Sequence, residues 1–121
     1  MTEYVVLIPG DEDQWANASA DDRAKMYAAH GEFAKILAER GHKMTGGAEL
    51  SHSKTAHIVT GSLDDVTVTA GPYAESVEQL TGFYSVESDD LDDLLKCVGR
   101  LAADGSRLEV RECVDNSGGT A

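Results

Sequence analysis

The stretch Gly82–Leu101, "GFYSVESDDLDDLLKCVGRL", carries two hydrophobic patterns in succession. Its first seven residues alternate between apolar and polar side chains, which is typical of a half-buried β-strand. Ser88 and the two aspartates after it then predict a helix start, because a serine caps free N–H groups and acids favour the positive end of the helix dipole. One buried helix face is expected, formed by Leu91, Leu94, Leu95, Val98 and Leu101. A strand followed by a helix is half of an α+β unit.

The N-terminal half of the chain repeats this succession. Tyr4–Ile8 is a continuous apolar run closed by Pro9-Gly10 and predicts a buried strand. "DEDQWANASAD" follows as a polar loop with one large anchor, Trp15. A Ser-x-x-acid start at Ser19 predicts a helix that runs to about Arg40, where Gly41 would form the C-cap. The apolar stripe of this helix is Met26, His30, Phe33 and Leu37, which Tyr27, Ala34 and Ala38 widen.

Three further segments read as strands. "HKMTGGAEL" predicts a strand with a bulge at Gly46-Gly47, and "RLEVREC" predicts the last strand. "TAHIVTG" and "VTVTAG" are rich in β-branched residues around "SLDD" and predict a hairpin. Without the hairpin the order is βαββαβ, so we predict an α+β fold of the ferredoxin-like type with an inserted β-hairpin. Residues 1–114 would form one domain and residues 115–121 a disordered tail.

Composition narrows the range of partners. The chain has 121 residues, with 10 Lys and Arg against 22 Asp and Glu, which gives a formal net charge of −12. An acidic surface repels nucleic acid and anionic lipid, so we expect neither as a partner. No apolar run reaches the length of a membrane span, and the N-terminus does not resemble a signal peptide. Cys97 and Cys113 lack metal-ligand spacing and are expected to be buried thiols in a reducing cytoplasm.

Cofactor and metal signals are weak in this sequence. His42, His52 and His57 match no familiar zinc spacing, and the last two would lie on opposite faces of a strand. "GGAEL" and "GPYAES" contain no phosphate-binding loop, and no order of Ser/His/Asp or Cys/His nucleophile residues is recognisable. We therefore expect no bound cofactor and no metal.

Several blocks of the sequence resemble the YCII-related proteins, and more narrowly their DGPF-motif group. The blocks are "GDEDQWA", "AAHGEFAKILAERG", "GGAEL", "VTVTAGPYAESVEQLTGFYSVESDDLDDLL" and "LEVREC". The resemblance extends over almost the whole chain except its tail and residues 51–62. The resemblance implies a dimeric α+β barrel, in which two sheets pack face to face in a homodimer. This agrees with the open sheet face that two helices on one side would leave.

The central motif departs from the pattern of the group, which reads Asp-Gly-Pro-Phe-Ala-Glu-Thr-Lys-Glu. Ala70 stands where the group has its Asp, Tyr73 replaces the Phe, and Val77 replaces the Lys. An arginine common in the preceding strand is also missing from residues 57–60, "HIVT". Related proteins have been proposed as enzymes that use a His–Asp pair, so the loss of the Asp weakens a catalytic interpretation. Members of the group often occur beside extracytoplasmic-function sigma factors, which implies a regulatory partner.

His30 is the strongest single site candidate. It lies on the buried stripe of the first helix and matches the histidine of the family's Ala-His-Gly block, so it could act as a general base. A base needs an orienting acid, for which Glu49 and Glu75 are candidates. Tyr73 and Glu75 lie in the stiff Gly71-Pro72 corner, and Tyr84 alternates with Phe83 on the strand that follows. Glu49, Tyr73, Glu75 and Tyr84 are therefore the expected pocket residues. The competing interpretations are a core histidine and ordinary surface carboxylates.

Three functions remain open at this point. The favoured one is a small-molecule-binding or accessory domain, because no complete catalytic pair is recognisable. The second is an enzyme for proton transfer, isomerisation or hydrolysis of a small metabolite, with His30 as its base. The third is a protein that binds a sigma factor or another regulator through its acidic surface.

Overall fold

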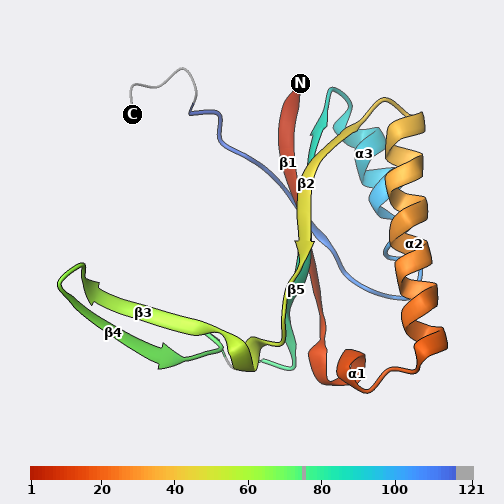
Figure 1. Ribbon diagram of the computed structural model, residues 1–121. Helices are drawn as coiled ribbons and strands as arrows, with labels where there is room; N and C mark the ends of the chain where they lie inside the picture. The colour runs from red at the N-terminus through yellow and green to blue at the C-terminus, as the bar shows by residue number, and fades with distance from the viewer. Residues whose placement is uncertain (75, 117–121) are drawn as a thin grey trace.

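The computed structural model describes residues 1–74 and 76–116. Its helices and strands follow the βαββαβ order with the inserted hairpin (Figure 1). In chain order they are β1 (Thr2–Asp11), α1 (Glu12–Ala16), α2 (Ala20–Glu39), β2 (Lys43–Glu49), the 3-10 turn η1 (Ser53–Thr55), β3 (His57–Ser62), β4 (Asp65–Ala70), β5 (Glu78–Ser88), α3 (Leu91–Val98) and β6 (Glu109–Glu112).

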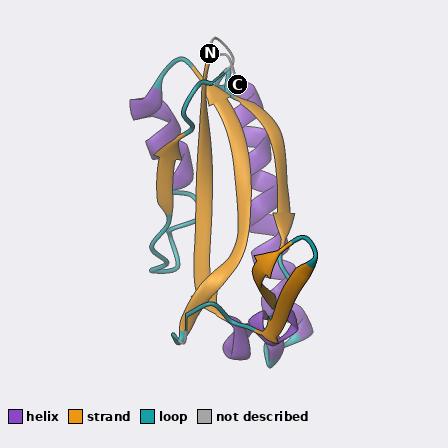
Figure 2. Ribbon diagram, turned by 90° about the vertical axis from the view of Figure 1, so that its left-hand side faces the viewer, coloured by secondary structure: helices purple, strands orange, loops and turns teal. Residues whose placement is uncertain are grey.

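The main sheet has the strand order β2-β5-β1-β6, and all of its neighbouring strands are antiparallel. Helices α2 and α3 lie together on one face of this sheet (Figure 1). The hairpin β3–β4 forms a separate two-stranded sheet that extends away from the helices, as Figure 1 shows. The view in Figure 2 shows the long, twisted strands of the sheet in front of α2. The predicted ferredoxin-like α+β fold is therefore confirmed.

The core lies between the helices and the sheet. Period-two alternation places Tyr4 and Val6 of β1 and Val86 of β5 on the helix side, where they meet Phe33 and Leu37 of α2. Each of these side chains is less than a tenth exposed. Burial of such a side chain stabilises the fold by about 1.5–3 kcal/mol before entropy is counted. The buried members of α3 and the turn after it are Leu94, Cys97, Val98 and Leu101.

Local signals set most helix and strand ends. The Oγ of Ser19 accepts a hydrogen bond from the N–H of Asp22 at 3.1 Å, as the capping pattern predicts. Gly41 has a φ of 83° and ends α2 in the left-handed conformation that glycine adopts without strain. The predicted irregularity in β2 is present, as a register shift between Met44 and Gly46 against β5. The expected hairpin pairs His57 with Ala70 at its open end.

Other expectations need correction. The segment after β1 is not a plain loop, because Asp11 caps the short helix α1 by accepting the N–H groups of Asp13 and Gln14. The cap of α3 is Asp90 rather than Ser88, since its carboxylate accepts the N–H of Asp93. The buried face of α3 is also rotated, so that Leu91 and Leu95, expected to be buried, are 40% and 46% exposed, whereas Cys97 is buried.

Two further sequence expectations have mixed outcomes. Cys97 is buried as expected, but Cys113 is only partly buried. Most of the tail predicted to be disordered, residues 117–121, lies outside the described residues. Within the described part of the chain, no helix is long and apolar enough to cross a membrane.

Candidate ligand cavity

A cavity of about 960 Å³ lies between the N-terminal half of α2 and the neighbouring ends of β1, β2 and β5, with α1 at one end. This volume is in the upper part of the range for small-molecule sites, which is about 300–1,000 Å³. Its most informative lining side chains are Trp15, Tyr27, His30, Glu49 and Tyr84. They come from α1, α2, β2 and β5, so only the folded chain brings them together.

His30 and Tyr84 form the inner polar pair of this cavity. The Nδ1 of His30 lies 2.7 Å from the Tyr84 hydroxyl, and their rings are in tilted contact. Burial lowers the pKa of His30 from its usual 6.5, although the carboxylates of Glu49 and Asp104 oppose this shift. Burial also raises the pKa of the Tyr84 phenol. Both groups are therefore neutral at pH 7. One of them donates the hydrogen bond between them and the other accepts it.

Tyr27 and Glu49 form a second polar pair nearer the surface. The Tyr27 hydroxyl donates to Glu49 Oε1 at 3.0 Å, and this bond raises the pKa of Tyr27. The Trp15 ring meets the Tyr27 ring edge to face, with 5.6 Å between centroids. Arg23 holds Trp15 in turn, because its Nη2 donates to the Trp15 and Ala16 carbonyls and its guanidinium lies 5.4 Å from the ring centroid.

The loop after β2 is tied to α1 at the mouth of the cavity. The carboxylate of Glu12, which is 9% exposed, accepts hydrogen bonds from both the N–H and the hydroxyl of Ser53. His52 Nδ1 accepts the N–H of Lys54, so its Nε2 carries the proton and donates to Asp13 at 2.7 Å. These bonds hold in place the residues that surround the opening, including His52 and Glu12 themselves.

Three of the five predicted site residues, His30, Glu49 and Tyr84, line this cavity together. Tyr73 is 91% exposed and does not line it, and Glu75 lies outside the described residues. The hydrogen-bond partner of His30 is the Tyr84 hydroxyl; within residues 1–74 and 76–116 no carboxylate forms a hydrogen bond to His30. The expected pairing of a base with an acid is therefore not what the described site shows.

Sequence reasoning missed several lining residues. Trp15 was expected only as an anchor of a loop, and Tyr27 as part of the buried stripe, although it is 54% exposed. The sequence presents His52 only as a weak candidate for a metal ligand. These three residues lie on α1, on α2 and in the loop after β2, so they meet only in the folded chain and no spacing rule joins them.

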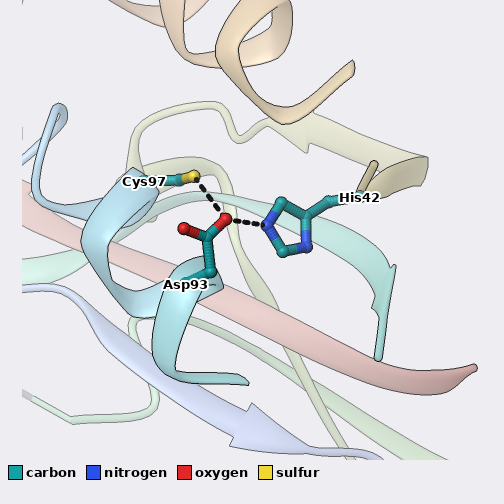
Figure 3. A group of neighbouring side chains, drawn as sticks. All are labelled: His42, Asp93 and Cys97. Carbon is teal, nitrogen blue, oxygen red and sulfur yellow. Dashed lines mark hydrogen bonds and ion pairs between the residues drawn. The ribbon is translucent and has the colours of Figure 1, made fainter. Parts of the chain in front are cut away.

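A second polar cluster lies at the opposite end of α2 (Figure 3). His42 Nε2 lies 2.8 Å from Asp93 Oδ2, and its Nδ1 lies 2.8 Å from the Ser88 hydroxyl. Arg40 donates to both carboxylate oxygens of Asp93. These contacts, chiefly the Arg40 bonds and then the His42 bond, lower the pKa of Asp93 to about 2. The Cys97 thiol faces the same carboxylate at 3.9 Å, as Figure 3 shows.

His42, Asp93 and Cys97 are the residues best placed to hold a metal, because their potential ligand atoms lie within 4.8 Å of one another. Nitrogen, oxygen and sulfur ligands of this kind suit Zn²⁺. However, both nitrogens of His42 already have partners, and the guanidinium of Arg40 repels a cation at Asp93. The group is better explained as a hydrogen-bonded link that ties the end of α2 to the start of α3.

The fold and the cavity define a small α+β protein with a ligand-sized pocket between a helix and a sheet. More specifically, the chain belongs to the family of YCII-related domains, since the model of that family matches residues 2–112. The narrower resemblance to the DGPF-motif group stays a prediction. No match was found among curated proteins.

Proposed function

We propose that this protein binds a small organic molecule in the cavity beside His30 and does not act on it by acid–base catalysis. The observation that carries the proposal is the composition of the cavity wall. It combines aromatic surface from Trp15 and Tyr27 with a few convergent polar groups, chiefly His30, Glu49 and Tyr84. This combination is typical of small-molecule sites, where apolar area supplies affinity and polar groups set orientation.

The pairing of His30 favours binding over catalysis. A histidine base needs a partner that orients it and stabilises its charged form, and a carboxylate does this best. The Tyr84 hydroxyl is neutral and has a raised pKa, so it gives little stabilisation to a protonated His30. The use of His30 as the base of a small-metabolite enzyme stays an alternative prediction.

Intrinsic fluorescence tests the binding proposal directly, because Trp15 is the single tryptophan of the chain and lines the cavity. A library of small organic fragments should contain members that change the Trp15 emission in a saturable way. Binding of these members should weaken at least about tenfold in Tyr84→Ala, which corresponds to about 1.4 kcal/mol. Tyr73→Ala is the matched control, because Tyr73 is exposed and outside the cavity. A library without any saturable ligand would refute the proposal.

We further propose that the protein is a homodimer. The sheet face opposite the helices carries Val5 and Leu7, and the hairpin on the same side exposes Val59 and Val68 at 62% and 55%. An isolated hairpin is only marginally stable in water, so a second copy that covers both surfaces would stabilise it. Sedimentation of the purified protein at micromolar concentration should give twice the monomer mass.

A sigma factor or other regulator as partner stays a prediction.

A further inference from the structure

Carboxylates dominate the charge of the cavity wall. Among the described residues, the lining includes five carboxylates, two histidines and no lysine or arginine. The five are Asp11, Glu12, Asp22, Glu49 and Asp104. His30 adds no positive charge at neutral pH, because burial lowers its pKa. An anionic ligand would therefore enter against a repulsive field, whereas a cation would be attracted.

The hydrogen bonds to four of these carboxylates come from hydroxyl and backbone N–H groups, which bring no positive charge. Tyr27 donates a hydroxyl to Glu49, backbone N–H groups satisfy Asp11, and Ser106 donates its N–H to Asp104. Glu12 accepts from Ser53 and has a histidine at 3.7 Å. Across the described part of the chain, no lysine or arginine forms an ion pair with any of the five.

Aromatic rings line the same space as these acids. Trp15, Tyr27 and Tyr84 all contribute to the wall, and the face of an aromatic ring attracts a cation through its quadrupole. The Arg23 guanidinium already lies over the Trp15 ring and would repel a second cation there, so the cation–π contact of a ligand would be with Tyr27 rather than Trp15. Arg23 itself does not line the cavity, since it is held by the carbonyls of Trp15 and Ala16.

We propose that the ligand of the cavity is an organic cation, a substituted amine or quaternary ammonium with an apolar body. Its positive group would lie near Glu49 and the ring of Tyr27, and its apolar part would reach toward Trp15 and Tyr84. Recognition would combine charge attraction with cation–π contact, as in aromatic cages that bind quaternary ammonium groups. This inference rests on the proposed function and names the class of ligand that the same site selects.

Three probes that share one phenyl ring test the inference: benzyltrimethylammonium, benzyl alcohol and benzoate. Each is titrated against the whole protein and followed by Trp15 emission, with isothermal calorimetry as a second readout. We expect benzyltrimethylammonium to bind at least about tenfold more tightly than benzyl alcohol, and benzoate to bind more weakly than both. Glu49→Gln keeps an acceptor for the Tyr27 hydroxyl and removes one charge, so it should weaken the cation about fivefold or more and leave benzyl alcohol unchanged.

The control variant is Glu39→Gln, which removes the same charge from an exposed site at the far end of α2. It should leave the affinity for all three probes unchanged. Equal losses of cation affinity in the two variants would show that the overall charge of the protein, rather than the cavity, attracts the probe, and would overturn the inference. Benzyl alcohol or benzoate as the tightest probe would overturn it too, but would leave the binding proposal standing. If none of the three probes binds and the fragment library also gives no ligand, both proposals fail.

Discussion

Two histidines lie along α2, His30 near the middle of the helix and His42 just beyond its C-terminal end, and each forms a hydrogen bond with a hydroxyl of β5. His30 pairs with Tyr84, and His42 pairs with Ser88 one helical turn beyond the end of α2. The local chemistry is similar, but the surroundings differ. His42 is 6% exposed and both of its ring nitrogens have partners, whereas His30 lies in the wall of a large cavity.

The difference separates a group that stabilises the fold from one that is available to a ligand. At the His42 end, Arg40 and His42 compensate the Asp93 carboxylate, so the charges are satisfied within the chain. At the His30 site, Glu49 accepts a hydrogen bond from the Tyr27 phenol and lines the cavity. Buried polar groups that are fully paired fix a structure, while polar groups that converge on a cavity without charge compensation favour binding. The following predictions test this contrast.

The largest effect is expected for His42→Ala. This change removes a buried ring and leaves Ser88 and Asp93 without their shared partner, which should cost about 3 kcal/mol in the free energy of unfolding. Chemical unfolding in urea, followed by circular dichroism, measures this cost. The His57→Ala variant serves as control, because His57 is exposed on the hairpin and its loss should change the free energy by less than about 0.5 kcal/mol.

A smaller loss in the free energy of unfolding is expected for His30→Ala. It removes one hydrogen bond and a partly buried ring beside a cavity that already contains open space, so about 1 kcal/mol is expected. A cost equal to that of His42→Ala would show that His30 is as structural as His42, which would contradict its availability to a ligand.

A smaller effect on the free energy of unfolding is expected at acidic pH, where the Asp93 carboxylate beside His42 becomes protonated. The pKa of Asp93 is lowered from 3.8 to about 2, chiefly by the Arg40 hydrogen bonds. The native state therefore binds this proton less readily than the unfolded chain, so the carboxylate stabilises the fold above pH 3.8 and loses this effect as the pH falls through about 2. The stability gap between the wild type and Asp93→Asn should be constant at neutral pH and close over this acidic interval.

Urea unfolding at a series of pH values measures the gap, and Asp92→Asn on the same helix turn is the control. A gap that stays constant down to pH 2 would contradict the assignment.

The sequence was sufficient for the fold because its signals are local. Alternation in β5, the Ser19 cap and the left-handed Gly41 each act within a few residues, and together they define the βαββαβ order. The expected helix starts were among the predictions that failed. Asp11 and Asp90 cap α1 and α3, yet both stand among other aspartates, so the pattern alone did not indicate which of them would cap.

The site was only partly predictable, because it depends on contacts between distant segments. Helical spacing was enough to place His30 on the inner face, and strand alternation was enough to point Tyr84 or Phe83 inward. The contact between Tyr27 and Glu49 joins residues 22 positions apart through the packing of α2 on β2, and no local pattern encodes it. Likewise, Asp93 and His42 are 51 positions apart, so the second cluster could not be recognised from histidine spacing.

The smallest effect is expected on the pKa of His30. This pKa reports whether the Glu49 carboxylate makes the cavity favourable for a cation. Burial lowers the pKa of His30 below 6.5, while Glu49 and Asp104 act in the opposite direction. Nuclear magnetic resonance of the imidazole should therefore show a pKa below 6.5 in the wild type. Glu49→Gln should lower the pKa of His30 further, because a nearby negative charge that stabilises the imidazolium is lost.

The sign of this second shift decides between two interpretations of the carboxylate. If Glu49 is an uncompensated charge that acts across the cavity, its removal must make His30 harder to protonate, as a bound cation also would. If the Tyr27 hydroxyl and the solvent already screen Glu49, the pKa of His30 will be the same in Glu49→Gln and in the wild type. The same screening would then leave little field for an organic cation, and the difference in function between the His30 and His42 sites would rest on cavity volume alone.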